Sequence, residues 1–144
     1  MDYGNCTTQT TNKLITASEH NRKLTIKNPS AKAVRKIKVD GCLVIDSSKR
    51  CDYMFEIIDN SAPDKIDSVI YLELKGRHIQ EAYEQIVATI DKFVTEHRGI
   101  KKTCHIVASR VPKTGPEVQQ LQVEMLRKKQ AKLTVSTIQA FVTI

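Results

Sequence analysis

The amino-acid sequence predicts an α/β domain in which helices flank a mixed β-sheet. Three observations support this fold class. Three β-prone segments precede residue 75, a helical repeat of apolar residues spans roughly residues 78–97, and a further strand, helix and strand complete the chain. The 144 residues leave room for little more than one domain of this kind.

The first three strands are predicted from runs of Val, Ile, Leu and aromatic residues. They cover residues 33–45, with an interruption at Asp40-Gly41, and then residues 51–58 and 68–74. Polar segments at residues 47–50 and 59–64 separate them. This pattern favours three successive antiparallel strands.

Apolar residues next recur at three- and four-residue intervals from Ile79 to Val94, which predicts a helix with one buried face. The segment Thr103 to Val111 contains an apolar run typical of a strand that is buried on both faces. A second helix begins near Pro116, because proline suits the first helical position. Residues 133–135 and 138–144 then predict the strands of an extra C-terminal α-β unit, and the strand–helix–strand connections favour parallel pairing.

The N-terminal part of the chain is harder to interpret. Residues 1–12 are polar and are expected to be loosely ordered, with a single domain over residues 13–144. Residues 13–30 allow two interpretations. Ser18 suits the cap of a short helix, whereas Leu24 and Ile26 suit a strand.

The net charge of +7 is distributed unevenly along the chain. Residues 1–50 hold 10 basic and 4 acidic side chains, residues 51–100 hold 5 and 10, and residues 101–144 hold 8 and 2. An acidic centre between basic flanks suits a carboxylate metal site within a phosphate-binding surface, although ordinary surface charge is an equal alternative. No apolar run approaches the ~20 residues that span a bilayer, so no membrane partner is expected.

The cysteines show no metal-binding spacing. Cys42, Cys51 and Cys104 lie in apolar or strand-like segments, and the N-terminus has neither the basic start nor the apolar stretch of a signal peptide. We therefore expect reduced core cysteines in a cytoplasmic protein.

The most informative motif is Glu73-Leu74-Lys75 at the end of the third predicted strand. Residues two apart on a strand share a face, so Glu73 and Lys75 point the same way, opposite to an apolar layer. Burying these charges is costly without a partner or a function, although an exposed ion-pair ladder is the alternative. If residues 51–58 pair with this strand, Asp52 approaches Glu73, and two such carboxylates suit Mg²⁺ or Mn²⁺.

An Asp followed by a strand-borne Glu-x-Lys and a helix resembles the PD-(D/E)XK nuclease superfamily, which includes restriction enzymes and Holliday junction resolvases. The resemblance implies a restriction-endonuclease-like fold with an αβββαβ core, of which residues 33–111 match everything after the first helix. It also implies that Asp52 and Glu73 hold Mg²⁺ or Mn²⁺ and that Lys75 assists the attacking water. Gln85 matches a helix position that supports the site in many members.

Two further acidic residues are candidates for the same site. Glu19 is the only candidate for the glutamate that the family often carries on its first helix. Asp40 is a rival for the metal-ligand role, although it suits a turn next to Gly41 equally well. None of the four histidines is assigned a catalytic role, and His105 is expected to be a hydrogen-bonded core residue.

The resemblance and the charge distribution together imply a metal-dependent endonuclease that hydrolyses phosphodiester bonds in duplex or branched DNA, in repair, recombination or antiviral defence. Cutting both strands favours a homodimer. The alternative is a catalytically inactive module with the same fold that binds nucleic acid or a protein. The residues expected to contact backbone phosphates are Arg22, Lys23, Lys27, Arg35, Lys36 and Lys38.

Overall fold

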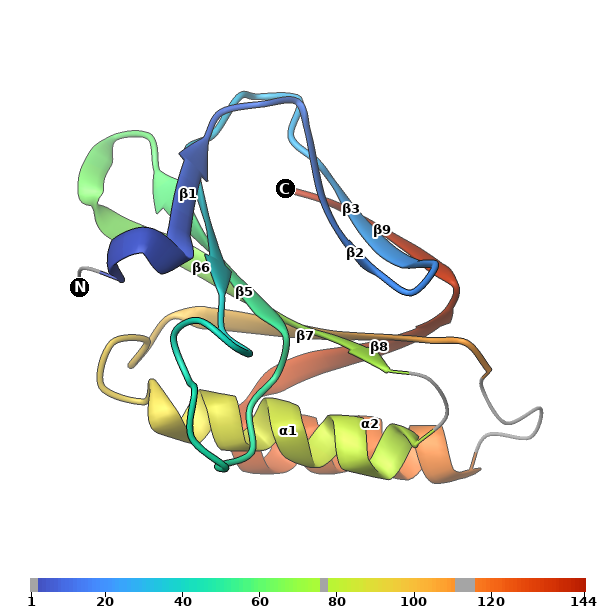
Figure 1. Cartoon of the computed structure of the whole chain (residues 1–144). Coiled ribbons are helices and arrows are strands. Elements are labelled where there is room, and N and C mark those ends of the chain that lie inside the picture. The colour runs from blue at the N-terminus through green and yellow to red at the C-terminus, as the bar shows by residue number, and fades with distance from the viewer. Residues whose placement is uncertain (1–2, 76–77, 111–115) are drawn as a thin grey trace.

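The computed structural model describes residues 3–75, 78–110 and 116–144. They form a mixed α/β protein with three layers, in which two helices cover one face of a six-stranded sheet and a three-stranded sheet covers the other (Figure 1). The order of elements is η1 (Gly4–Cys6), β1 (Thr7–Thr10), β2 (Leu14–Glu19), β3 (Arg22–Lys27), β4 (Val34–Lys38), β5 (Tyr53–Asp59), β6 (Ala62–Lys75), α1 (Ile79–Lys92), β7 (Lys101–Ala108), α2 (Pro116–Lys129), β8 (Ala131–Thr137) and β9 (Gln139–Thr143).

The large sheet has the strand order β1-β4-β5-β6-β7-β8. β4, β5 and β6 are antiparallel neighbours, as the sequence predicts, and the β6–β7 and β7–β8 pairs are parallel. β5 is central, and all its residues except the two ends are buried. The strand predicted to reach Val111 ends at Ala108, and Val111 lies outside the described residues.

Two hydrophobic clusters occupy the two spaces between the layers. The cluster beneath the helices includes Met54, Tyr71 and Ile86, and the cluster beneath the small sheet includes Phe55 and Leu72. Neighbouring residues of β5 and β6 therefore alternate between the two faces, as strand geometry requires. α1 packs on β6 and β7, and α2 packs on β8. Within the described ranges, no helix is long and apolar enough to cross a membrane.

Residues 13–30, for which the sequence allows either a short helix or a strand, contain a β-hairpin. β2 and β3 pair antiparallel, and Ser18 lies within β2 and caps no helix. His20 and Asn21 form the turn with φ values of 49° and 68°, the left-handed conformations that two-residue hairpin turns require. The helix that the resemblance implies before these strands is not present among the described residues, and β9 adds in parallel to the hairpin found there.

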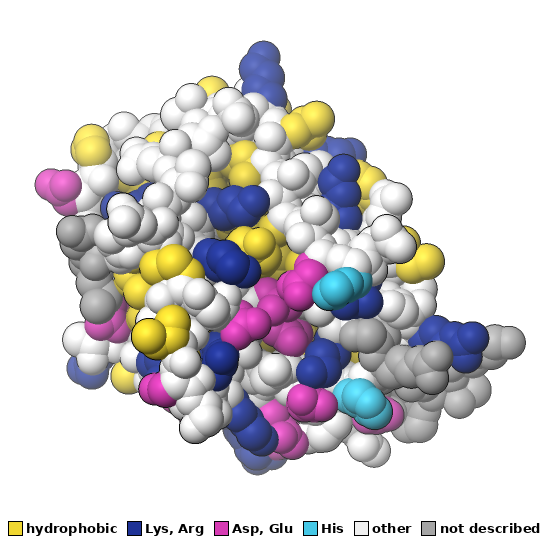
Figure 2. All heavy atoms as spheres, in the orientation of Figure 1, with side chains coloured by type: hydrophobic (Ala, Val, Ile, Leu, Met, Phe, Trp, Pro, Cys, Tyr) yellow, Lys and Arg dark blue, Asp and Glu magenta, His cyan; other side chains and the backbone are white. Residues whose placement is uncertain are grey.

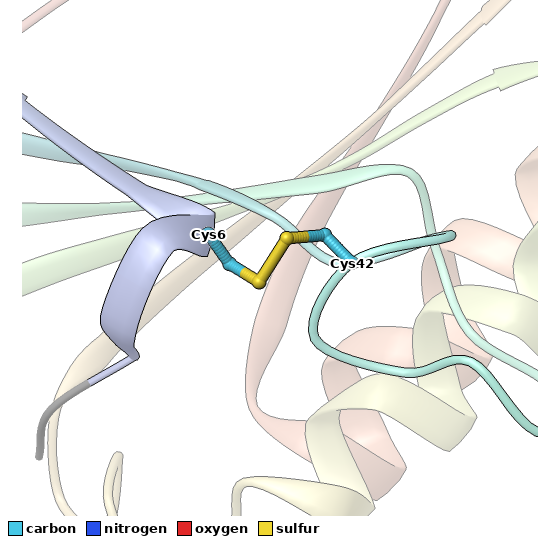
Figure 3. Close-up of a disulfide and its surroundings, with 2 residues drawn as sticks. All are labelled: Cys6 and Cys42. Carbon is cyan, nitrogen blue, oxygen red and sulfur yellow. A yellow bond between two sulfur atoms is a disulfide. The ribbon is translucent and has the colours of Figure 1, made fainter.

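The N-terminal segment also differs from the expectation of loose order. β1 pairs with β4 at the edge of the large sheet, and Cys6 forms a disulfide with Cys42 (Figure 3). The prediction that Cys42 is reduced is wrong, because the β1–β4 pairing brings the two Cα atoms to 5.7 Å, within the range that a disulfide spans. Cys51 and Cys104 are free and buried, as predicted. Residues 1 and 2 lie outside the described residues.

The residues after β4 turn sharply instead of extending the strand to residue 45. Gly41 has a φ of 78°, a conformation open to glycine, and Val44 N donates to Val39 O at 2.9 Å. The turn returns the chain toward Cys51, so that Val39 N donates to Asp52 O at 2.9 Å. This turn places Asp40 and Asp52 at the same end of the large sheet.

Candidate functional site

Two buried carboxylates face each other at the end of the large sheet where β5 begins and β6 ends. Asp52 immediately precedes β5, and its backbone N–H donates to Leu72 O at 3.1 Å, so that the β5–β6 ladder continues to the site. Asp52 Oδ2 accepts a hydrogen bond from Leu74 N at 2.8 Å. The backbone of the Glu-Leu-Lys motif thus holds the Asp52 side chain next to Glu73.

The burial of this pair controls its protonation. Asp52 is 7% exposed and Glu73 is 3% exposed. Burial, and after it the charge of the Asp52 carboxylate, raise the pKa of Glu73 to about 9, although the Lys75 ammonium opposes the shift. Burial likewise raises the pKa of Asp52, although the hydrogen bond from Leu74 N opposes this. With no cation bound, the pair of carboxyl groups therefore holds a proton at neutral pH.

A divalent cation would replace that proton. Glu73 Oε1 is buried and has no hydrogen-bond partner among the described residues, as expected for an oxygen that serves a ligand. The described residues contain no group of three or more His, Cys, Asp or Glu side chains that could hold a metal ion. An ion between Asp52 and Glu73 would have two carboxylate ligands, a number that Mg²⁺ accepts in proteins because it keeps several of its waters.

Lys75 lies beside the carboxylate pair and also contacts α1. Its Nζ donates to Glu81 Oε1 at 3.0 Å, and its charge lowers the pKa of Glu73. The Lys75 side chain is 23% exposed, so one side of the ammonium group is open to solvent or substrate. Glu81, in the first turn of α1, was not a predicted site residue. The sequence could have indicated Glu81, because it lies in the first turn of the helix that follows the Glu-x-Lys motif.

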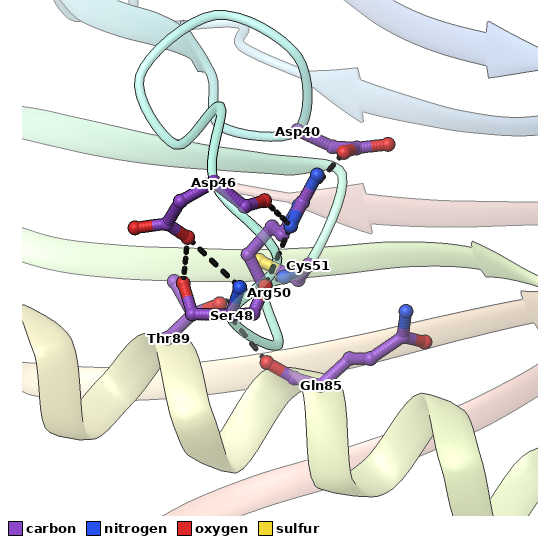
Figure 4. Close-up of polar contacts among 7 residues, drawn as sticks. All are labelled: Asp40, Asp46, Ser48, Arg50, Cys51, Gln85 and Thr89. Atoms are coloured by element: carbon purple, nitrogen blue, oxygen red, sulfur yellow. Dashed lines mark hydrogen bonds and ion pairs between the residues drawn. The ribbon is translucent and has the colours of Figure 1, made fainter.

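Gln85 lies on α1 with its side-chain amide directed toward the sheet (Figure 4). Its Oε1 is buried without a hydrogen-bond partner among the described residues. Its backbone oxygen accepts a hydrogen bond from Thr89 Oγ1 at 2.9 Å, and Thr89 Oγ1 accepts one from Cys51 N at 2.7 Å. The Thr89 hydroxyl thereby joins α1 to the residue before Asp52, a positioning contact that sequence reasoning missed.

Asp40 and Glu19 lie near the pair but have other partners. Asp40 Oδ1 accepts from Arg50 Nε at 2.9 Å, and Arg50 also donates to the backbone oxygen of Ser48 at 2.6 Å (Figure 4). Glu19 ends β2 and lies 3.7 Å from the ring of His20. Both acidic groups raise the pKa of Asp52 by their charge. In the view of Figure 2, acidic side chains gather near the middle of the surface, with Lys and Arg side chains around them.

The six basic residues expected to contact phosphates do not form one continuous surface. Arg35 donates to the buried Glu56 at 2.9 Å, and Arg22 donates to Ser109 at 3.0 Å. Lys36 and Lys38 lie over the Tyr53 ring. The other two are exposed residues of β3, Lys23 and Lys27, and the second of these lies over Phe141. Arg35 is therefore engaged in an internal ion pair.

A second buried polar network lies beneath α1, further along β5 and β6. Glu56 accepts hydrogen bonds from Arg35 and from Tyr3, the latter at 2.8 Å, and lies 2.6 Å from His97 Nε2. His97 Nδ1 lies 2.7 Å from the Tyr71 hydroxyl. The prediction of a strand over residues 51–58 assigned no role to Glu56, which is fully buried in the structure.

His105 differs in part from the expectation. It is buried, as predicted, and burial lowers its pKa to about 4. Its Nδ1, however, has no hydrogen-bond partner among the residues that the structure describes.

Comparison of the chain with protein-family models, with curated proteins and with solved structures found no match.

Proposed function

We propose that this protein is a divalent-metal-dependent nuclease that hydrolyses phosphodiester bonds of DNA. The observation that carries the proposal is the buried Asp52–Glu73 pair on adjacent antiparallel strands, with Lys75 on the same face. The order β4-β5-β6-α1-β7 supports a restriction-endonuclease-like core, in which a hairpin stands where the first helix is expected. A homodimer in the cytoplasm acting on duplex or branched DNA is part of the same proposal.

Each residue has a distinct role in this proposal. Asp52 and Glu73 hold Mg²⁺ or Mn²⁺ between them. The bound ion supplies Lewis-acid activation of the phosphate and a water molecule of lowered pKa. The ammonium of Lys75 stabilises the negative charge that develops on the phosphate oxygens as water adds to phosphorus and the bond to the leaving oxygen breaks. Gln85, whose amide is directed toward the sheet, orients the water or a phosphate oxygen.

Protonation links metal binding to pH. Because the pKa of Glu73 is raised to about 9 without metal, the cation must displace a proton from the pair near neutral pH. Metal affinity therefore rises with pH up to about 9. A site without this coupling would bind metal with little pH dependence over the same range.

The direct test is cleavage of plasmid and branched DNA in Mg²⁺, in Mn²⁺ and in EDTA. Wild type is compared with Glu73→Gln, which keeps the side-chain shape but removes the charge. Glu84→Gln is the matched control, since Glu84 is on α1 but pairs with Lys49 at 2.7 Å. Absence of metal-dependent cleavage by wild type, or equal cleavage by wild type and Glu73→Gln, contradicts the proposal.

One observation favours the alternative of an inactive module that binds nucleic acid or a protein. The Lys75 ammonium donates its hydrogen bond to Glu81, and not to Asp52 or Glu73. The substitution Glu81→Gln separates the two functions. In a nuclease it frees Lys75 and changes the cleavage rate, whereas in an inactive module it changes neither cleavage nor metal binding.

A further inference from the structure

Two lysines of β4 converge on one aromatic ring of β5. The Nζ atoms of Lys36 and Lys38 lie 5.3 Å and 5.0 Å from the centroid of the Tyr53 ring. Lys38 and Tyr53 are register partners, and residues two apart on β4 share a face, so both side chains extend across the same side of the sheet. This side faces away from the helices.

Neither ammonium group has a carboxylate partner among the described residues. Lys36 Nζ donates to the backbone oxygen of Thr16 at 2.6 Å, which leaves two of its three protons for another acceptor. Burial lowers the pKa of Lys36, and the charge of Lys38 lowers it further. Two like charges held together without a counter-charge favour the binding of an anion.

The lysine pair lines a cavity that such an anion would occupy. The cavity has a volume of about 340 Å³, enough for a phosphate group with its bridging oxygens. Cys6 and Cys42, which form the disulfide, also line it. The remaining lining residues are Asn5, Thr8 and Tyr53, all of which have polar side-chain atoms.

The cavity lies at the same end of the large sheet as the carboxylate pair. Tyr53 directly follows Asp52, and Lys38 directly precedes Val39, whose N–H donates to Asp52 O at 2.9 Å. A polyanion that crosses this end of the sheet would reach both places.

We propose that Lys36, Lys38 and Tyr53 form a phosphate-binding pocket that holds a backbone phosphate of DNA on the side of the sheet opposite the carboxylate pair. The choice of DNA as the source of the phosphate rests on the proposed function. The pocket itself rests on the two lysines without a carboxylate partner among the described residues and on the cavity that they line. Lys36 and Lys38 together contact one phosphate, and the Tyr53 ring fixes the direction of both side chains.

The test is the salt dependence of DNA binding in EDTA, where no metal-dependent cleavage occurs. Fluorescence anisotropy with a labelled duplex compares wild type with Lys38→Met and with the double variant Lys36→Met/Lys38→Met. The control is Lys65→Met/Lys101→Met, which removes two charges from exposed lysines elsewhere. The double variant is expected to bind about tenfold more weakly, with the slope of log K against log salt reduced by about 1, while the control stays close to wild type.

A second arm identifies the source of the phosphate. Inorganic phosphate and the DNA duplex are added separately to wild type, and the NMR signals of the two lysine side chains are followed. Both ligands are expected to shift them. An unchanged slope and affinity in the double variant overturns the proposal. If the lysine NMR signals shift with inorganic phosphate but not with DNA, the assignment to a DNA strand is overturned and the ligand is a free phosphate.

These outcomes are distinguishable from failure of the proposed function. Binding in EDTA requires neither a metal ion nor cleavage, and the variants leave Asp52 and Glu73 unchanged. A protein that binds DNA through the pocket but does not cleave it in Mg²⁺ refutes the nuclease proposal alone. Lys38→Met replaces an exposed residue, so it provides a result even if the double variant folds poorly.

Discussion

Replacing Glu73 by Gln is expected to stabilise the metal-free protein at alkaline pH. In the folded state the pKa of Glu73 is raised to about 9, so the side chain keeps its proton while the unfolded chain has already lost it. The folded protein gains stability by holding this proton more tightly than the unfolded chain does. This contribution to the free energy of unfolding is fully present below the ordinary pKa of glutamate, and it is lost as pH rises toward about 9. Gln has the shape of the protonated side chain and can donate to Asp52, but it does not titrate.

The magnitude follows from the protons bound by each state. Where the unfolded chain has lost the proton and the folded chain retains it, stability falls by about 1.4 kcal/mol per pH unit. Between about pH 6 and pH 8 the free energy of unfolding of the wild type should therefore fall by about 3 kcal/mol more than that of Glu73→Gln. The value is an upper bound, since Asp52 titrates together with Glu73 and shares the proton.

The assay is urea unfolding in EDTA, followed by circular dichroism at several pH values. Glu84→Gln is the control, since its carboxylate is exposed and paired with Lys49. Added Mn²⁺ should remove much of the pH dependence in wild type and have little effect on Glu73→Gln. Identical pH slopes for wild type and Glu73→Gln in EDTA would refute the argument that Glu73 holds a proton.

Three further changes test the structure around the site, each by urea unfolding. Reduction of the Cys6–Cys42 disulfide is expected to cost about 2–4 kcal/mol, because it frees a loop of 36 residues in the unfolded chain, and an unchanged midpoint would show that the bond does not constrain it. Arg35→Met is expected to cost about 3 kcal/mol, because it leaves the buried Glu56 carboxylate without its guanidinium partner. A loss of DNA affinity without loss of stability would instead make Arg35 a phosphate contact. Thr89→Val should cost about 1–3 kcal/mol, since it leaves a buried backbone N–H without an acceptor, and a neutral effect would contradict the bridging role of the hydroxyl.

The parts of the fold that were predictable from sequence have strong periodicity. The helical repeat beginning at Ile79 and the alternation around Glu73 and Lys75 each fix which side chains face inward, and the structure has both patterns. The sequence analysis expected Asp52 near Glu73 if residues 51–58 pair with the third strand, and the register with Tyr53 opposite Leu72 brings the two carboxylates together.

The differences from the predictions arise where distant segments decide the local structure. Residues 14–27 alternate weakly, and they form a hairpin because β9 and the face of the large sheet bury Leu24 and Ile26. Cys6 and Cys42 pair because β1 adds to β4, which a polar N-terminus did not indicate. Likewise, the burial of Glu56 depends on partners contributed by Tyr3, Arg35 and His97. Such partners are far apart in the sequence, so no local pattern reveals them.

The Cys6–Cys42 disulfide also determines how the protein would respond to mechanical force. Tension applied at the two ends of the chain passes from Cys6 through the sulfur atoms to Cys42, so the residues between the two cysteines carry no load. That segment contains β1, β2, β3 and β4. A molecule stretched in the oxidised state would therefore extend about 120 Å less on complete unfolding than the reduced one. The residues of these four strands would remain within a closed covalent loop after the rest of the chain had been pulled straight.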